Sequence, residues 1–199
     1  MPIGFSHLDI SGRKIRLRPT RTADTEAAYN LITNEAILSN LAWDGPANED
    51  ELLNSYRRWE KEIKTGENYS RTIERLDQPG AIGCINIRFP KHPQQADIGY
   101  WLGVPFWNQG YMTEAIRLAC HLTFKHLDTV RVYTTVFAGN LGSRWVLEKN
   151  GFSLDGTMRC HVNKRGRWRD AWFFTLLRTE WEHNYKTYCP NHEEIVAKR

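Results

Sequence analysis

Metal-binding and disulfide patterns are absent from the 199-residue sequence. It contains four cysteines, none of them in a CxxC pair: Cys84, Cys120, Cys160 and Cys189. The seven histidines form no HExxH motif, because the run that begins at His192 lacks the second histidine. Zinc and catalytic metal sites depend on such spacings, so we expect chemistry without a metal. A disulfide framework is not expected either, since no export signal is recognisable.

Long apolar runs and a strong charge of one sign are also missing. The mean hydropathy is −0.59, and no stretch approaches the roughly 18 apolar residues of a membrane helix. The first residues, MPIGFSH, lack a basic start followed by an apolar run, so we expect a cytoplasmic protein. Lys and Arg number 27 against 23 Asp and Glu, a net charge of +4. This excess is too small to indicate nucleic-acid binding by itself.

The sequence does contain an ordered series of strand and helix patterns. Hydrophobic residues make up 41%, enough for one core, and we expect a single domain over residues 1–199. Periodicity predicts strands at 14–18, 69–75, 81–89, 96–104, 131–136, 152–162 and 169–178, and helices at 22–33, 48–66, 113–127 and 140–150. This order predicts an α/β fold with a mixed central sheet of about seven strands flanked by four or more helices. The three consecutive strands should form an antiparallel meander, and strand–helix–strand units favour parallel neighbours.

Some helices carry local signals at their ends or along one face. Asn48 and Glu51 form a capping-box pattern, and Gly66 ends the same helix. On the helix predicted at 113–127, the polar stripe includes Glu114 and His121. We therefore expect His121 to be a solvent-exposed residue and not a catalyst.

A short loop with Gly110 joins the strand at 96–104 to the helix that begins near Thr113. The first turn of a helix has unpaired N–H groups and the positive end of the helix dipole, and glycine lets the backbone approach a ligand. The pattern suits an anion such as a pyrophosphate; an ordinary strand-to-helix turn is the alternative. The loop is neither a Walker loop nor the GxGxxG fingerprint.

Four segments occur in the order and spacing of a known family. They are IGYWL at 98–102, QGYMTEA at 109–115, NxxS at 140–143 with LEKNGF at 147–152, and GxWRD at 166–170. In these segments the chain resembles the general N-acetyltransferase (GNAT) superfamily. Residues 81–181 are similar to its RimJ/RimL-type branch, the ribosomal-protein N-terminal acetyltransferases and their relatives. With a looser fit of the N-terminal third, the resemblance covers nearly the whole chain.

The resemblance implies acetyl-CoA as co-substrate, with its pyrophosphate on the glycine loop and no metal. It implies cofactor contacts at Leu102, Gly103, Val104, Asn108, Gln109, Gly110, Tyr111, Met112 and Thr113, with backbone donors around Leu102 facing the thioester oxygen. The superfamily loop has Gln or Arg, two residues, Gly, one residue, then Gly or Ala. Here Pro105, Asn108 and Gly110 occupy these three positions. Because Asn tolerates positive φ better than other non-glycine residues, we expect the turn to persist.

Asn140 and Ser143, three residues apart, share one face of a helix. The resemblance implies that Asn140 contacts the pantetheine arm of the cofactor and that Ser143 stands near its sulfur. Many family members place a proton-donating Tyr seven residues after the Asn, where this chain has Leu147. Ser143 is therefore the candidate proton donor. The alternative is that Asn140 caps the helix and Ser143 adds to the cap.

Asp97 points to the same side of its strand as Gly99 and Trp101. Some members carry a glutamate at this position, so the resemblance implies that Asp97 draws a proton from the acceptor amine; a solvated strand-end Asp is the alternative. His161 or a water molecule are further candidates for the base. A free α-amine, with a pKa near ~8, needs less help than a lysine near ~10.4.

Basic residues dominate the connection between the last two strands. The run consists of Arg159, Lys164, Arg165, Arg167 and Arg169, against the single acid Asp170. It could attract an acidic partner or form a solvated hairpin loop, with Trp168 as its anchor. We expect no membrane partner and no direct nucleic-acid binding, and a homodimer remains open. The cleft should form where the strands at 96–104 and 131–136 diverge, walled by Trp43, Trp101 and Trp107.

The sequence as a whole predicts an acetyl-CoA-dependent N-acetyltransferase. Its expected reaction is direct attack of a primary amine on the thioester, most simply the α-amine of a protein or peptide. Acetylation of a small amine or an amine-bearing antibiotic is the alternative within the enzyme class. A non-catalytic acyl-CoA-binding regulator is the alternative outside it.

Overall fold

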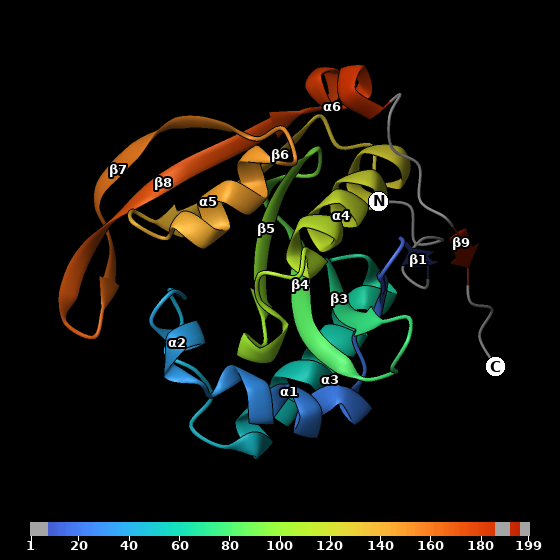
Figure 1. Ribbon diagram of the computed structural model, residues 1–199, viewed down its shortest axis with the longest axis vertical. Coiled ribbons are helices and arrows are strands. Elements are labelled where there is room, and N and C mark those ends of the chain that lie inside the picture. The colour runs from blue at the N-terminus through green and yellow to red at the C-terminus, as the bar shows by residue number, and fades with distance from the viewer. Residues whose placement is uncertain (1–7, 186–191, 196–199) are drawn as a thin grey trace.

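A single twisted sheet runs through the computed structural model, which describes residues 8–185 and 192–195 (Figure 1). Within these residues nine strands lie in the order β7-β8-β6-β5-β4-β3-β2-β1-β9. The strands are β1 (Leu8–Ser11), β2 (Ile15–Pro19), β3 (Asn68–Arg75), β4 (Ala81–His92), β5 (Gln95–Leu102), β6 (Arg131–Phe137), β7 (Ser153–Lys164), β8 (Arg167–Leu177) and β9 (His192–Ile195). The helices are α1 (Thr25–Ile32), α2 (Glu35–Leu38), α3 (Glu49–Thr65), α4 (Tyr111–His126), α5 (Leu141–Glu148) and α6 (Arg178–Tyr185), with short 3-10 turns η2 (Thr22–Asp24) and η3 (Val104–Phe106).

The predicted α/β fold with a mixed sheet is confirmed. The seven expected strands are β2 to β8, while β1, β9, α2 and α6 are additions. The meander of β3, β4 and β5 is antiparallel as predicted. Parallel neighbours occur across α4, between β5 and β6. The expectation of parallel neighbours is wrong for β2 and β3, which are antiparallel. It is also wrong for β6 and β7, which are not neighbours: β8 lies between them and pairs with β6.

Local signals fix both ends of α3 as the sequence indicates. The Asn48 side chain accepts a hydrogen bond from the Glu51 N–H at 2.9 Å, which satisfies one unpaired donor of the first turn. The Glu51 carboxylate in turn accepts from the Ala47 N–H at 2.7 Å, one residue before the expected partner. Gly66 ends the helix in the left-handed conformation, at φ 76°.

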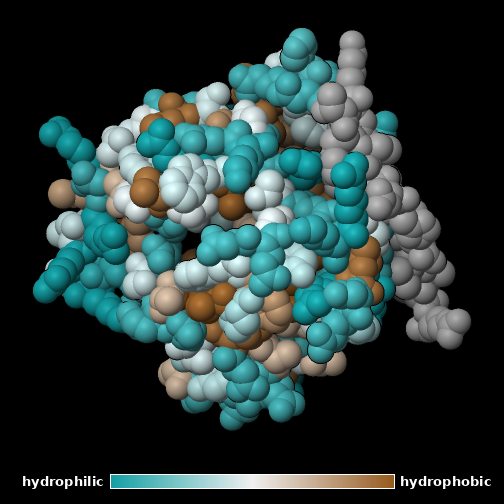
Figure 2. Space-filling view, viewed as in Figure 1, coloured by the Kyte–Doolittle hydropathy of each residue, from teal (hydrophilic) through white to brown (hydrophobic). Residues whose placement is uncertain are grey.

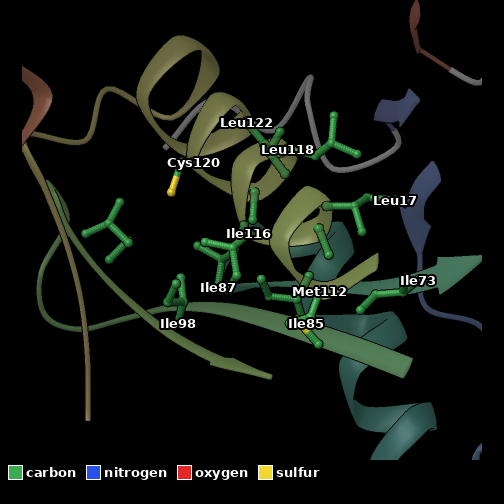
Figure 3. Packing of buried hydrophobic residues seen from close by; sticks show 14 of the residues in the cluster. Leu17, Ile73, Ile85, Ile87, Ile98, Met112, Ile116, Leu118, Cys120 and Leu122 are labelled. Atoms are coloured by element: carbon green, nitrogen blue, oxygen red, sulfur yellow. The ribbon is translucent and has the colours of Figure 1, made fainter. Parts of the chain in front are cut away.

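The main core lies between α4 and one face of the sheet (Figure 3). Ile85, Ile87 and Ile98 point from β4 and β5 toward Met112 and Ile116 on α4. A second, smaller cluster on the opposite face unites α1, α2 and α3 with Trp101 of β5. β5 is therefore held from both sides, which fixes the strand that leads into the glycine loop.

Two residues predicted on the polar stripe of α4 are buried, so that prediction is wrong for them. His121 is 1% exposed, because Trp181 of α6 covers it, with 6.1 Å between the two ring centroids. Glu114 is 9% exposed and accepts hydrogen bonds from the backbone N–H groups of the turn between β1 and β2. Both contacts come from segments distant in sequence, which helical periodicity does not reveal.

β5 and β6 separate after a short common ladder. Their last paired residues are Asp97 and Tyr133, and the Thr134 hydroxyl then donates to the Ile98 carbonyl at 2.7 Å. From there β6 follows β8 while β5 follows β4. The two strands therefore diverge where the sequence predicts the cleft.

Candidate functional site

The glycine loop adopts the turn that its sequence was expected to allow. Asn108 and Gly110 both have positive φ, 59° and 82°, so Asn108 does take the left-handed conformation. Gly110 is the N-cap of α4 and offers no side-chain cap. The N–H groups of Tyr111, Met112 and Thr113 therefore have no partner within the helix, and the positive end of the dipole adds to their attraction for an anion.

Side-chain contacts hold this loop in place. The Gln109 amide donates to the Pro105 carbonyl at 2.9 Å, and the Trp107 indole donates to the Leu102 carbonyl at 2.7 Å. From the opposite side, the Lys14 ammonium donates to the Gln109 carbonyl at 2.9 Å. The loop is thereby preformed, which lowers the entropic cost of binding a ligand.

A backbone donor at the end of β5 faces the cleft. The Gly103 N–H donates to the Ile82 carbonyl of β4 at 2.9 Å. Since successive N–H groups of a strand point to opposite sides, the Leu102 N–H points away from β4, toward the space that β6 has left. Such a donor can stabilise a developing oxyanion. Val104 begins the 3-10 turn that follows.

The first turn of α5 brings Asn140 and Ser143 together. The Asn140 side chain accepts from the Ser143 N–H at 3.1 Å, so Asn140 does cap the helix, as the alternative interpretation held. Asn150 docks α5 against the loop: its amide donates to the Thr113 carbonyl at 3.1 Å and to the Val146 carbonyl at 2.8 Å. This contact sets the spacing between the start of α4 and α5.

Tyr100 is a residue of the site that the sequence did not single out. Strand alternation groups it with Ile98 and Leu102, which belong to the core. Its hydroxyl oxygen is shielded from solvent and has no hydrogen-bond partner among the described residues. Burial raises the pKa of Tyr100 strongly, and the neighbouring Ser143 lowers it by less. The phenol therefore stays protonated.

Asp97 lies on the opposite face of the sheet, where it is only partly free to act as a base. Its carboxylate accepts a hydrogen bond from Arg88 at 2.8 Å and is 24% exposed. Tyr133 is close by: burial first, and then the charge of Asp97, raise the pKa of its hydroxyl. The gap between β5 and β6 thus has two sides, one that faces α4 and α5 and one that carries Asp97.

Most of the predicted solvated basic run is engaged within the protein. Lys164 is buried and donates to the Trp43 carbonyl at 2.8 Å, with the Asp44 carboxylate at 2.6 Å. Arg165 pairs with Glu35 at 2.7 Å. These contacts join the β7–β8 hairpin to α2 and to the segment after it. We call the residues that make them, Lys164 and Arg165 with Glu35, Trp43 and Asp44, the rim.

Trp168 does not anchor the hairpin, so that expectation is wrong: its side chain is 63% exposed. Arg169 instead lies over the Phe137 ring, 4.5 Å from its centroid, and donates to the Ser39 carbonyl. Trp43, expected at the cleft wall, contributes its carbonyl to the rim and is 42% exposed.

A small pocket opens beneath this rim. It is lined by Asn40, Ala42, Thr135, Val136, Phe137, Val162 and Ala171. The space-filling view shows a hollow between the hairpin side and the body of the molecule (Figure 2). His161, the alternative base, is exposed on β7 next to Val162 of the lining.

The described residues include neither a cluster suited to a metal ion nor a membrane-spanning helix. They contain no group of three or more His, Cys, Asp or Glu side chains placed to hold a metal ion. Among the helices of residues 8–185, none combines the length and apolarity needed to cross a membrane.

Known proteins share both the sequence pattern and the fold. Residues 14–153 match the family model described as Acetyltransferase (GNAT) domain. The probable N-acetyltransferase YjcK of Bacillus subtilis (strain 168) is 27% identical over 177 residues, which cover 86% of this chain and 98% of that protein.

Solved structures agree in fold. RimJ of Mycobacterium smegmatis in complex with CoA-disulfide superposes with a TM-score of 0.81 at 22% identity, covering 92% and 95% of the two chains. A ribosomal L7/L12 α-N-protein acetyltransferase, RimL, gives 0.75 at 23%, covering 85% and 93%. With a family model that spans more than half of its length, this chain belongs to the GNAT family and is an acetyl-CoA-dependent N-acetyltransferase.

Proposed function

We propose that the chain acetylates the α-amine of a protein or peptide. The observation that carries this proposal is the Arg88–Asp97 pair, 2.8 Å apart. Asp97 is the candidate base, and its carboxylate is already engaged by the Arg88 guanidinium. An α-amine, with an ordinary pKa of about 7.7–8.0, is partly neutral at pH 7, whereas a lysine near 10.4 is not. An acceptor that needs little deprotonation therefore suits a site whose candidate base is engaged by arginine.

The residues proposed to act in the reaction lie on the two sides of the gap between β5 and β6. On the α4 side, the loop from Asn108 to Thr113 would bind the pyrophosphate of acetyl-CoA, and the Leu102 N–H would face the thioester oxygen. On the other side, the amine would approach past Asp97. The carbon–nitrogen bond forms as the carbon–sulfur bond breaks. Asp97 or water takes the amine proton, and Ser143 gives a proton to the departing sulfur.

Relatives by fold support the acceptor class. The structure named RimL is described as an α-N-protein acetyltransferase. At 23% identity its acceptor comes to this chain only as part of the proposal. The contacts of Lys164 and Arg165 engage part of the basic run within the protein, and we assign recognition to the amine and its nearest residues.

A peptide panel tests the acceptor. Each peptide carries one internal lysine and is made with a free and with a blocked N-terminus, and thiol release is measured together with the site of acetylation by mass spectrometry. Acetylation confined to free N-termini supports the proposal. Labelling of the lysine, or activity on small amines alone, contradicts it. Binding of acetyl-CoA without thiol release from any amine would identify a regulator.

The proton donor is tested with Ser143→Ala. Loss of a general acid acts in the transition state, so we expect kcat to fall about a hundredfold while the dissociation constant of acetyl-CoA changes little. An unchanged kcat with weaker acetyl-CoA binding would assign Ser143 to cofactor binding.

A further inference from the structure

The glycine loop contains a peptide group that the loop residues themselves do not hold in one orientation. Among the described residues, the only atom within 4 Å of a Cβ added at Gly110 is the Lys14 ammonium nitrogen, at 4.0 Å. Glycine adopts positive and negative φ with similar ease, so no side chain at position 110 prevents the peptide between Gln109 and Gly110 from turning over. In one orientation its N–H faces a bound anion, and in the other its carbonyl oxygen does.

Lys14 fixes this orientation from the β1–β2 turn. Its ammonium donates to the Gln109 carbonyl at 2.9 Å. Because the peptide is planar and trans, the Gly110 N–H points the opposite way, away from β2. In the sheet β3 and β4 separate β2 from β5 and the gap beyond it, so this N–H is directed toward the side of the gap. No group of the described residues accepts a hydrogen bond from it.

Three contacts hold Lys14 itself in place. Its backbone N–H donates to the Glu114 carboxylate of α4 at 3.2 Å, and its carbonyl accepts from the Leu76 N–H at 3.0 Å. The ammonium also lies 5.8 Å from the centroid of the Tyr111 ring, a distance at which an aromatic face attracts a cation. The lysine is therefore anchored at both ends of its side chain, and its hydrogen bond to the loop is preformed.

We propose that Lys14 is a positioning residue of the acetyl-CoA site, which keeps the Gly110 N–H directed at the pyrophosphate. The lysine lies 95 residues before Gln109 in the sequence, and it acts through the loop and not by touching the cofactor. Without it, the peptide would also populate the orientation in which the Gln109 carbonyl opposes the phosphate charge. Only a fraction of the protein would then be competent to bind, and the apparent affinity would fall by that fraction.

Binding of CoA in the absence of an acceptor tests this role. Dissociation constants of CoA, and of pantetheine, which lacks the pyrophosphate, are measured by calorimetry for the parent, Lys14→Met, Lys14→Arg and Arg13→Met. Lys14→Met should bind CoA about tenfold more weakly, because a hydrogen bond from a charged group is lost, and should bind pantetheine as the parent does. Lys14→Arg retains a donor for the carbonyl and should restore most of the affinity.

Arg13→Met is the matched control for charge. It removes one positive charge from the neighbouring exposed residue, and it keeps the Arg13 contact with Glu114, which the backbone N–H makes. We expect its CoA affinity to stay within about twofold of the parent, the effect of a screened surface charge. The comparison is repeated at 1 M salt, where the Debye length is about 3 Å. A loss caused by charge alone disappears under screening, whereas a loss caused by peptide orientation persists.

Four results would overturn the proposal. Parent-like CoA affinity in Lys14→Met, or a loss that vanishes at 1 M salt or is matched by Arg13→Met, would leave Lys14 only a surface charge. An equal loss for pantetheine would show general damage to the site. Lys14→Arg as weak as Lys14→Met would exclude the hydrogen bond as the cause. Because no acceptor is present, failure of the peptide panel to show acetylation would not alter these outcomes.

Discussion

Gly12 and Glu114 make a contact whose loss should be measurable in stability. Gly12 is buried in the turn between β1 and β2, and an added Cβ would lie 2.0 Å from the Glu114 carboxylate oxygen. The backbone of Gly12 is outside the positive-φ region, so alanine fits its conformation. Gly12→Ala should therefore act only by expelling the Glu114 side chain.

The magnitude follows from the hydrogen bonds that Glu114 accepts. The N–H groups of Arg13 and Lys14 both donate to its carboxylate, the latter at 3.2 Å. A hydrogen bond to a charged group contributes about 1.5–3 kcal/mol. Water can replace part of it, because both donor residues are exposed. We expect Gly12→Ala to lower the free energy of unfolding by about 2–4 kcal/mol.

Urea unfolding of four proteins tests the reasoning: the parent, Gly12→Ala, Glu114→Ala and the double variant. Once the carboxylate is gone, an alanine at position 12 has nothing to displace. The double variant should thus be no less stable than Glu114→Ala, with a coupling energy of about 2 kcal/mol. Additive losses would refute the assigned contact.

Three further predictions concern the cofactor loop, the buried ion pairs and the rim. Acetyl-CoA at a hundred times its dissociation constant should stabilise the parent by about 2.7 kcal/mol, seen as a rise in melting temperature. Gly110→Asp should abolish this rise, because Gly110 has a φ of 82° that aspartate adopts with strain and because the added negative charge repels the pyrophosphate. Burial acts to raise the pKa of Asp24, but the hydrogen bonds from Arg18 outweigh burial and hold the pKa of Asp24 below its usual value. The contribution of this ion pair to the free energy of unfolding is therefore full above the unfolded pKa of about 4 and is lost as the pH falls below that value. Asp24→Asn should then unfold more easily at pH 7 and show a flatter acid limb in urea titrations between pH 5 and 3; a parallel limb would contradict the assignment. Lys164→Met should raise the KM for the acceptor several-fold with an unchanged KM for acetyl-CoA, and the reverse pattern in steady-state kinetics would contradict a role of the rim on the acceptor side.

The sequence predicts best what short-range chemistry controls. Asn48 and Gly66 mark the ends of α3 because a cap and a left-handed glycine need only their own neighbours. The left-handed Asn108 is predicted for the same reason, since its φ depends on its own side chain. Such residues can be interpreted without knowing the fold.

Residues whose surroundings come from distant segments are predicted poorly. His121 is polar by periodicity but is covered by Trp181 of α6. Lys164 looks like part of a solvated loop until the segment after α2 supplies the Asp44 carboxylate. Tyr100 looks like a core residue, and only the fold shows that its hydroxyl is enclosed without a hydrogen-bond partner among the described residues.

The parting of β5 and β6 also bears on how this protein avoids aggregation. Past Asp97 and Tyr133, two strands turn unpaired edges toward each other in the middle of a sheet, and open strand edges recruit strands from other chains. Here α4 and α5 are joined through Asn150, and Lys164 connects the β7–β8 hairpin to Trp43 and Asp44. These contacts hold the elements around the gap in place, and so oppose the separation of β5 and β6 that insertion of a foreign strand would require.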